Sequence, residues 1–437
     1  MRITKRSNSI METSKVFGVS NEKIESYIER EKVDDLFKSG IRSNKHIIVF
    51  GSSKQGKTAL TNRHVIETEC VKIDCSPETN PVDIYKSVLR QLNIEFEVEK
   101  NTTNEISGEL NSEVTAKVSV PFISGDASLG AVVSGSKTSD VKTVKIEYNL
   151  NLPQDISEIL RKINFKKRII LENFHYLKEE VQKQLAFDLR VFEDNNILFV
   201  ILGIWREKNR LAQFNGDLQD RLIEIPVEPW EKEDFKKVVN IGEGLLNVSF
   251  NNVLSKIEEV SFDSIGVFQE MCKESCFAAG VLETSKEIIT LTEEHFLKAV
   301  DKKMDDYRGR HTRSIECFVE QTKKSNDAVP LYLAYYFIKF LFEQNFEIIV
   351  GGLKRPDIHA GIKKNHHRPD DVRSSDMSNF LHNIVPSQIS KSIVPPIFDY
   401  DSNSRTLKII DSTFYFFLRN SNLNEIFEDF DKPEGIS

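Results

Sequence analysis

The sequence predicts an α/β protein whose mostly parallel sheet is followed by a helical unit and by a C-terminal unit of helices and a β-hairpin. Three observations support this. Short apolar runs alternate with helical spacing up to about residue 230, helical spacing alone continues to about residue 325, and two alternating runs flank a polar turn near the C-terminus. Continuous apolar strands between helices are typical of a parallel sheet covered on both faces.

The strands of the α/β unit are expected at five short runs that are rich in apolar and β-branched residues. Helical spacing separates these runs, for example over residues 178–193, and Pro81 is a favourable first residue for a helix through Leu89. The predicted strands cover residues 46–50, 70–75, 168–171, 196–203 and 222–227.

Residues 100–150 interrupt this pattern with a Ser-, Thr-, Gly- and Val-rich stretch in which apolar residues alternate. Alternation with a period of two, separated by Gly-rich links, predicts a β-rich insertion. It could be a partner-contact arm or a decoration of the fold, and the sequence leaves both open. The two alternating sets are Val114, Ala116, Val118, Val120 and Phe122, and then Val144, Ile146, Tyr148, Leu150 and Leu152.

A chain of 437 residues is long enough for about three domains. We expect a flexible or partly docked lead-in at 1–26, an α/β unit at 27–230 and a helical lid domain at 231–325. The last unit, 326–437, has the layout of a winged helix-turn-helix, with an apolar helix, two further helices and a hairpin. The two further helices are predicted near 356–364 and 376–392, and the hairpin over 397–411.

Composition places limits on the class of protein. The chain is 39% hydrophobic with a net charge of −8, which fits a folded protein that does not bind polyanions over its whole surface. The most apolar run, 331–342, is short and contains Lys339, so we expect a core helix and no membrane span. No signal peptide is recognisable, so a cytoplasmic location is expected. Cys272 and Cys276 are expected to be buried thiols rather than metal ligands.

The segment GSSKQGKT, residues 51–58, matches the phosphate-binding pattern G-x-x-x-x-G-K-[ST] in full. It lies between a predicted strand and a predicted helix, which is the context that the pattern requires. Lys57 is expected to reach the β- and γ-phosphates, and the Thr58 hydroxyl to bind Mg²⁺. The sequence therefore predicts ATP with Mg²⁺ as its ligands. The expected binding residues are Gly51, Ser52, Ser53, Lys54, Gln55, Gly56, Lys57, Thr58 and Ala59.

An acidic residue closes the predicted strand at 168–171. Glu172 stands where such folds present a carboxylate to the water shell of the metal ion. The next residue, Asn173, stands where a carboxylate that activates water is usual. Because an amide cannot take a proton from water, we expect slow hydrolysis or another activating group. An ordinary acid at the end of a strand is the alternative for Glu172.

Two arginines are candidates for contact with phosphate. Arg206 follows the fourth strand, at the edge where ligands bind, and could sense the γ-phosphate; a surface arginine at the start of a helix is the alternative. Arg221 precedes the fifth strand and could point towards the nucleotide of a neighbouring subunit. The alternative for Arg221 is an ion pair within its own chain, with Asp217 or Asp220.

A basic stretch in the C-terminal unit suggests contact with a phosphate backbone. A latch against the ATPase unit and a solvated loop are the alternatives. If the unit binds DNA, reversing the charges of Lys363 and Lys364 removes salt-dependent binding. The stretch comprises Lys354, Arg355, Lys363, Lys364, Arg368 and Arg373, with His359, His366 and His367.

Taken in order, these motifs resemble those of STAND-type NTPases and their AAA+ neighbours, especially archaeal-type ATPases and origin-recognition initiators. Residues 27–37 look like the Arg-Glu box of that group, which implies that Arg30 contacts the nucleoside side. ENFHYL is similar to its Asp-Glu-aromatic-x-Tyr-Leu segment, which assigns Glu172 to magnesium and Asn173 to the catalytic-acid position. The resemblance implies a P-loop NTPase sheet of strand order 5-1-4-3-2.

The resemblance extends to two later segments. Residues 220–230 are similar to the AAA+ segment that holds an arginine finger, and residues 411–420 resemble the end of the winged-helix domain in archaeal-type ATPases. The chain departs from the pattern at Asn173, in the insertion, and at 264–271, where a lid motif would carry an arginine and none is present.

These features predict a nucleotide-controlled switch, a weak ATPase that forms homo-oligomers and acts on an effector protein of unknown identity. The resemblance to such ATPases implies a setting in bacterial defence. Two alternatives remain. One is a DNA-binding ATPase of the initiator or transposition-helper type, and the other is a scaffold that holds its nucleotide without hydrolysing it.

Overall fold

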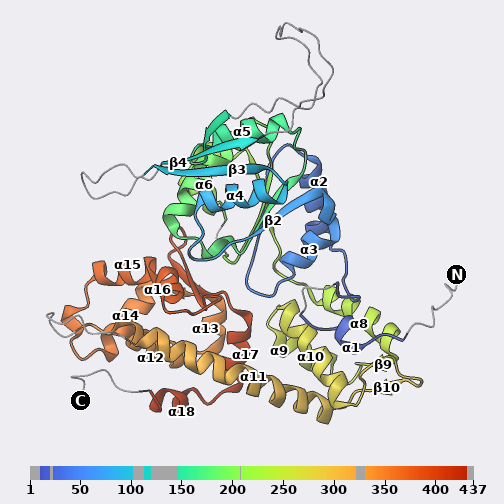
Figure 1. Ribbon diagram of the computed structural model, residues 1–437. Coiled ribbons are helices and arrows are strands. Elements are labelled where there is room, and N and C mark those ends of the chain that lie inside the picture. Colours follow the sequence, from blue (N-terminus) through green and yellow to red (C-terminus); the bar gives the residue numbers. More distant parts are fainter. Residues whose placement is uncertain are drawn as a thin grey trace, which may run out of the picture.

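The computed structural model describes residues 10–19, 23–101, 113–119, 146–206, 208–320 and 330–430. Figure 1 shows the sheet-bearing unit at the top, the helical unit at the lower right and the C-terminal unit at the lower left. Within the described ranges, no helix combines the length and the apolar character that crossing a membrane requires.

The central sheet consists of β1 (His46–Phe50), β2 (Cys70–Asp74), β6 (Arg168–Glu172), β7 (Phe199–Gly203) and β8 (Leu222–Pro226). Its order is β2-β6-β7-β1-β8, and every pairing is parallel. Counted along the chain as strands 1 to 5, this is the order 5-1-4-3-2. The predicted fold class and strand order are therefore confirmed.

Helices cover both faces of this sheet because successive strand residues point to opposite sides. Ile48 and Phe50 belong to the core under one face, whereas Ile47 and Val49 belong to the core under the other. The first core packs on α4 (Pro81–Gln91), α5 (Pro153–Lys162) and α6 (Glu179–Asp194), and the second on α2 (Leu36–Arg42) and α3 (Lys57–His64).

The described parts of the insertion, with the residues just before it, form a separate antiparallel sheet of order β3-β4-β5, as its predicted β character requires. Its strands are β3 (Glu95–Asn101), β4 (Glu113–Ser119) and β5 (Ile146–Asn149), so the sheet begins before residue 100. Tyr148 and Leu150 are buried in the core of the α/β unit, whereas Leu152 is exposed. The expected strand residues Val120, Phe122 and Val144 lie outside the described residues.

The helical unit contains a short parallel strand pair that the sequence did not predict, β9 (Val248–Ser249) with β10 (Ile289–Thr290). The described part of the N-terminal lead-in is docked on this unit, since Val16 and Phe17 are fully buried. Phe17 fills the space beside Gly242, where a Cβ would lie 2.0 Å from its ring. The helices are α1 (Thr13–Val16), α8 (Lys232–Leu246), α9 (Leu254–Ser261), α10 (Ile265–Ala278) and α11 (Glu293–Val319).

The C-terminal unit has the predicted helices and the predicted hairpin, although the helix expected at 376–392 is divided at Asn383. A third strand joins the hairpin, giving the order β11-β13-β12. The assignment as a winged helix stays a prediction. The elements are α12 (Leu333–Phe342), α13 (Phe346–Gly351), β11 (Leu353–Lys354), α14 (Arg355–Asn365), α15 (Ser374–His382), α16 (Ile384–Ser390), β12 (Phe398–Asp401), β13 (Thr406–Ile409), α17 (Ser412–Asn420) and α18 (Leu423–Glu428).

Two helices join the helical and C-terminal units. The 27-residue α11 places Met304 in the core of the helical unit and Ile315 in the core of the C-terminal unit. Helix α17 divides its side chains in the same way, since Phe416 lies in the first core and Phe417 in the second. Figure 1 shows α11 running beneath both units. These shared helices link the positions of the two units.

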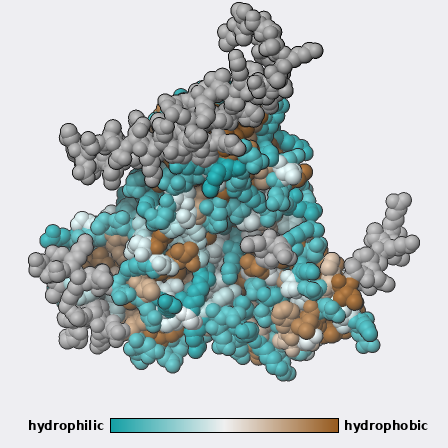
Figure 2. Space-filling view, in the orientation of Figure 1, coloured by the Kyte–Doolittle hydropathy of each residue, from teal (hydrophilic) through white to brown (hydrophobic). Residues whose placement is uncertain are grey.

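The surface is mainly hydrophilic in the view of Figure 2, with a group of hydrophobic residues at the lower right, over the helical unit. Leu282, Ile288 and Leu297 of that unit are exposed.

A matched pair of glycine substitutions tests the packing of the C-terminal unit. A Cβ at Gly361 in α14 would lie 2.0 Å from the Phe340 ring, whereas a Cβ at Gly309 in α11 would meet nothing within 4 Å. Gly361→Ala should lower the free energy of unfolding by about 1–3 kcal/mol because the core is overpacked. Gly309→Ala should raise it by up to about 1 kcal/mol because alanine favours helix. Urea unfolding followed by circular dichroism measures both, and equal effects would contradict this packing.

Candidate phosphate-binding site

The loop between β1 and α3 has the backbone of a phosphate-binding loop. Gly56 has φ +84°, a left-handed conformation that favours glycine, and it directly precedes α3. Gly51 leaves room for the end of β8, since a Cβ there would lie 2.8 Å from Cγ2 of Val227. The sheet order, the motif and this geometry together show a P-loop NTPase domain.

Lys57 is a half-buried cation at the first turn of α3. Its Nζ donates to the Gly51 carbonyl at 3.0 Å and to the Ser52 carbonyl at 2.6 Å. Burial lowers the pKa of Lys57 to about 8, and the Glu228 carboxylate acts in the opposite direction. A half-buried ammonium group that is held by carbonyl oxygens is stabilised further by an anion. The site therefore fits a phosphate group.

A cavity of about 260 Å³ opens beside this loop. Its walls come from the loop, from the ends of β6 and β7, from α10 and from the N-terminal segment. The expected binding residues Lys54, Gln55, Gly56, Lys57, Thr58 and Ala59 line it, together with Arg30, Glu172 and Asn173.

Arg30 lines the cavity beside Trp230. Its Nη1 donates to the Val227 carbonyl at 2.9 Å, and its guanidinium group lies 3.8 Å from the centre of the Trp230 ring. Burial lowers the pKa of Arg30, while Asp234 and Asp34 act in the opposite direction. The structure thus places Arg30 in the cavity wall, and its contact with a nucleoside stays a prediction.

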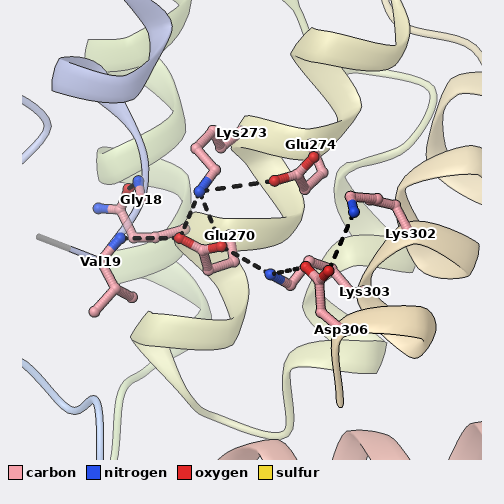
Figure 3. Close-up of polar contacts among 9 residues, drawn as sticks. Gly18, Val19, Glu270, Lys273, Glu274, Lys302, Lys303 and Asp306 are labelled. Carbon is pink, nitrogen blue, oxygen red and sulfur yellow. Dashed lines mark hydrogen bonds and ion pairs between the residues drawn. The ribbon is translucent and has the colours of Figure 1, made fainter. Parts of the chain in front are cut away.

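The N-terminal segment is fastened over this cavity by the helical unit. The backbone N–H of Val19 donates to Glu270 Oε1 at 3.0 Å, and that of Gly18 donates to Gln269 Oε1 at 3.2 Å. Figure 3 shows Glu270 between Val19 and Lys303, with Lys273 above it. The hydrogen bond to the Glu270 carboxylate is charge-assisted and therefore stronger than the neutral one to Gln269. The lead-in therefore contributes part of the binding site, which sequence reasoning missed.

Glu172 stands at the end of β6, next to the first turn of α3. Burial raises the pKa of Glu172, the Lys72 ammonium lowers it, and a hydrogen bond with the Thr58 side chain lowers it as well. A hydroxyl and a carboxylate in hydrogen-bonding contact are oxygen ligands of the kind that Mg²⁺ prefers. Thr58 and Glu172 therefore fit the predicted metal site.

The side chain of Asn173 is held by an acid from the neighbouring strand. Its Nδ2 donates to Asp74 Oδ1 at 2.6 Å, at the end of the neighbouring strand β2. Sequence reasoning missed Asp74. The signal was present, since the strand Cys70–Asp74, like the strand that ends at Glu172, closes with an acid.

His175 is a second residue that sequence reasoning missed. It is buried, and in the described part of the chain neither ring nitrogen has a hydrogen-bonding partner. Burial lowers its pKa to about 3, and Lys57 and Arg210 lower it further. It lines both the cavity at the loop and a larger cavity of about 880 Å³ between the α/β and C-terminal units. Among the described residues, no cluster of metal-ligating side chains was found.

Arg206 braces the loop. Its Nε donates to Ser52 Oγ at 2.7 Å, and its Nη2 lies 3.1 Å from Glu228 Oε2. Glu228 in turn accepts hydrogen bonds from the backbone N–H and the hydroxyl of Ser52. Arg206 does not line the 260 Å³ cavity. Its proposed contact with the γ-phosphate stays a prediction.

Arg221 forms ion pairs within its own chain, with Glu193 and, at 2.6 Å, with Asp194. These are not the partners expected from the sequence, Asp217 and Asp220. Its carbonyl accepts from the N–H of His46 at the start of β1, so Arg221 lies at the edge of the sheet opposite the loop. A contact with another subunit stays a prediction.

The C-terminal unit contacts the loop directly. The Ser53 N–H donates to the Ile410 carbonyl at 2.8 Å, and the Ser53 hydroxyl donates to Asp411 Oδ1 at 3.2 Å. The Ser412 hydroxyl donates back to the Ser53 carbonyl at 3.1 Å. Arg310 of α11 holds the fully buried Asp411 through a 2.5 Å ion pair.

The next loop residue, Lys54, packs against the helical unit. A Cβ at Gly266 in α10 would lie only 2.4 Å from Lys54 Cβ. The Lys54 ammonium lies 5.4 Å from the centre of the Tyr307 ring in α11. In the loop, Ser52 therefore contacts the α/β unit, Ser53 the C-terminal unit and Lys54 the helical unit.

The basic stretch of the C-terminal unit is partly used inside the fold. His359 and His366 hydrogen-bond the carbonyls of Val372 and Leu331, and Arg355 donates to Ser374. DNA binding stays a prediction. The residues of this stretch that remain exposed are Lys354, Lys364 and Arg373.

No protein-family model matches this chain, and no curated protein matches it. It is similar to solved structures of three archaeal proteins. The first is the Walker-type ATPase of Pyrococcus abyssi, with a TM-score of 0.47, 12% identity and coverage of 90% of this chain and 96% of that chain. The second is the Aeropyrum pernix ORC2 protein in ADPNP–ADP complexes, with a TM-score of 0.44, 11% identity and coverage of 90% and 93%.

The third is the Aeropyrum pernix ORC1 protein in complex with DNA, with a TM-score of 0.42, 11% identity and coverage of 97% and 98%. At TM-scores below 0.5, these likenesses assign no residue roles to this chain.

Lys57→Ala should weaken ATP binding by about 10- to 150-fold, since hydrogen bonds to charged groups contribute about 1.5–3 kcal/mol. Isothermal titration calorimetry with ATP and Mg²⁺ measures the change. Lys32→Ala is the control, because that side chain is 87% exposed and pairs with Glu231 outside the loop. An unchanged affinity in Lys57→Ala would remove the loop as the phosphate site.

Proposed function

We propose that the protein is an ATP-binding regulatory ATPase that works as a nucleotide-controlled switch. The observation that carries the proposal is the hydrogen bonding of Ser53 to residues 410–412. A P-loop holds phosphates with its own backbone N–H groups. Because the Ser53 N–H is given to the Ile410 carbonyl, a rearrangement of the loop around phosphates changes its contact with the C-terminal unit.

A second connection supports the same coupling. Arg206 contacts Ser52 in the loop through its side chain, and its backbone hydrogen-bonds the buried carboxylate of Asp399 in β12. Arg210 lies 3.8 Å from the same carboxylate. The segment after β7 therefore contacts both the loop and the C-terminal hairpin.

The C-terminal and helical units respond together in this proposal because α11 and α17 belong to both cores. A ligand shifts such an equilibrium only by its difference in affinity for the two forms. We propose that the γ-phosphate supplies that difference by favouring a loop conformation in which Ser53 releases Ile410. ATP with Mg²⁺ then favours the open form, and ADP the docked one.

Magnesium, held by Thr58 and through water by Glu172, would neutralise charge on the β- and γ-phosphates. Hydrolysis is slow in this proposal, since Asn173 cannot accept a proton. Slow turnover suits a switch because it sets how long the open form lasts.

The open form is proposed to assemble with other copies of the chain and to act on an effector protein, in a defence setting like that of the ATPases that the sequence resembles. In an oligomer, Arg221 would exchange its ion pairs with Glu193 and Asp194 for a neighbouring nucleotide. Asp194 is 51% exposed, so one of these pairs is accessible to solvent and weak.

Asp411→Ala tests the switch because it removes the partner of Arg310 and the acceptor of the Ser53 hydroxyl. We expect release of a fluorescent ADP analogue to become about tenfold faster, equivalent to about 1.4 kcal/mol of lost closed-state stability. Stopped-flow fluorescence measures release, and mass photometry measures assembly with ATP and Mg²⁺. Asp429→Ala, at an exposed carboxylate, is the control. Unchanged release and assembly in Asp411→Ala would refute the switch.

A further inference from the structure

The carboxyl ends of β2 and β6 bring an acid and an amide together beside the nucleotide cavity. The two strands are parallel neighbours with Asp74 in register with Glu172, and the Cys75 N–H donates to the Glu172 carbonyl at 3.0 Å. Asn173 follows with φ 55° and lines the cavity. Its left-handed backbone turns the chain at this point, and its side chain meets Asp74.

The hydrogen bond between these side chains fixes which way the amide faces. An ionised carboxylate only accepts hydrogen bonds, so the atom of Asn173 at 2.6 Å from Asp74 Oδ1 must be the NH₂ group. The amide oxygen, Oδ1, lies in the same plane on the other side of the Cβ–Cγ axis and points away from Asp74 Oδ1. Within the described ranges, no residue donates a hydrogen bond to this oxygen.

This orientation matters for a water molecule that attacks a phosphorus atom. The attacking lone pair of the water must face phosphorus, so its O–H groups have to donate to acceptors elsewhere. An amide oxygen is such an acceptor, whereas an NH₂ group would compete for the lone pair. A water-positioning amide is sufficient for this role in some P-loop NTPases.

We propose that Asp74 is a positioning residue for ATP hydrolysis, which holds the Asn173 amide so that its oxygen orients the attacking water. This assignment rests on the weak ATPase activity in the proposed function. The water oxygen forms a bond to the γ-phosphorus as the bond from that phosphorus to the β–γ bridging oxygen breaks, and the bond electrons leave with ADP. The proton of the water passes to a γ-phosphate oxygen and departs with orthophosphate.

The pair is suited to a mutational test because Asp74 is exposed and outside the cores. Its substitution leaves the sheet intact. In Asp74→Ala, the amide loses its anchor and can rotate, so kcat should fall by about tenfold to a hundredfold, as expected for a misplaced catalytic group. The affinity for ATP should stay within about twofold, since Asp74 does not line the cavity.

Asp74→Asn separates positioning from proton transfer. The amide oxygen of the new asparagine accepts the same hydrogen bond, so this variant should keep most of the wild-type kcat. A double-mutant cycle gives the second readout. If Asp74 acts only through Asn173, the double variant Asp74→Ala/Asn173→Ala should have the kcat of Asn173→Ala alone. Glu78→Ala is the control, since it removes an 85% exposed carboxylate from the loop after β2.

Steady-state phosphate release by these variants, together with ATP affinities from calorimetry, tests the positioning role of Asp74. A wild-type kcat in Asp74→Ala would overturn the assignment, as would additive losses in the double variant. Loss of activity in Asp74→Asn equal to that in Asp74→Ala would also overturn it, because the charge and not the acceptor would then be required. A wild-type protein that binds ATP without releasing phosphate would remove hydrolysis from the proposed function and this role with it. Wild-type turnover that Asp74→Ala leaves unchanged would refute the role of Asp74 alone.

Discussion

The contact of Ser53 with residues 410–412 determines how the rest of the molecule is connected to its binding site. The loop residue gives its N–H and its hydroxyl to the C-terminal unit and accepts a hydrogen bond in return. Its neighbours contact the other units, Ser52 through Arg206 and Lys54 through Gly266. A loop whose conformation depends on three units cannot change shape around a ligand without affecting all of them.

The proposed response to phosphate depends on the charges around the loop. Asp411 is fully buried, and the Arg310 and His311 charges together with hydrogen bonds from Thr413 keep its pKa low against the effect of burial. Breaking a buried ion pair by removing one partner is costly, because it leaves an uncompensated charge. The Lys57 ammonium group is held by two neutral carbonyl oxygens. A negatively charged phosphate stabilises its charge more than these neutral groups do. The form in which the C-terminal unit contacts the loop is thus held by the Arg310–Asp411 ion pair. The same loop is followed by Lys57, a cation that is suited to bind an anion.

Local patterns were enough to predict the strands of the sheet and the loop, whereas the strand order came from the resemblance to P-loop ATPases. The strands are short apolar runs, and the phosphate-binding motif lies within eight consecutive residues, so both can be recognised without knowing how the chain folds back. The hydrogen bond from Ser53 to Asp411 joins residues 358 positions apart, and that from Asn173 to Asp74 joins residues 99 positions apart. Rules based on residue spacing do not predict contacts between residues so far apart in the sequence. The actual partners of Arg206 and Arg221 were missed for the same reason, and the docking of the lead-in depends on Phe17 filling the space beside Gly242.

Hydrogen–deuterium exchange over residues 408–420, with and without ATP and Mg²⁺, measures the central claim most directly. These residues carry the contact with Ser53 and all of α17, and their amides report opening of the C-terminal unit. The account predicts faster exchange at this segment when ATP and Mg²⁺ are bound, with no change in Lys57→Ala. Identical exchange in the nucleotide-free and the ATP-saturated wild-type protein would contradict the account.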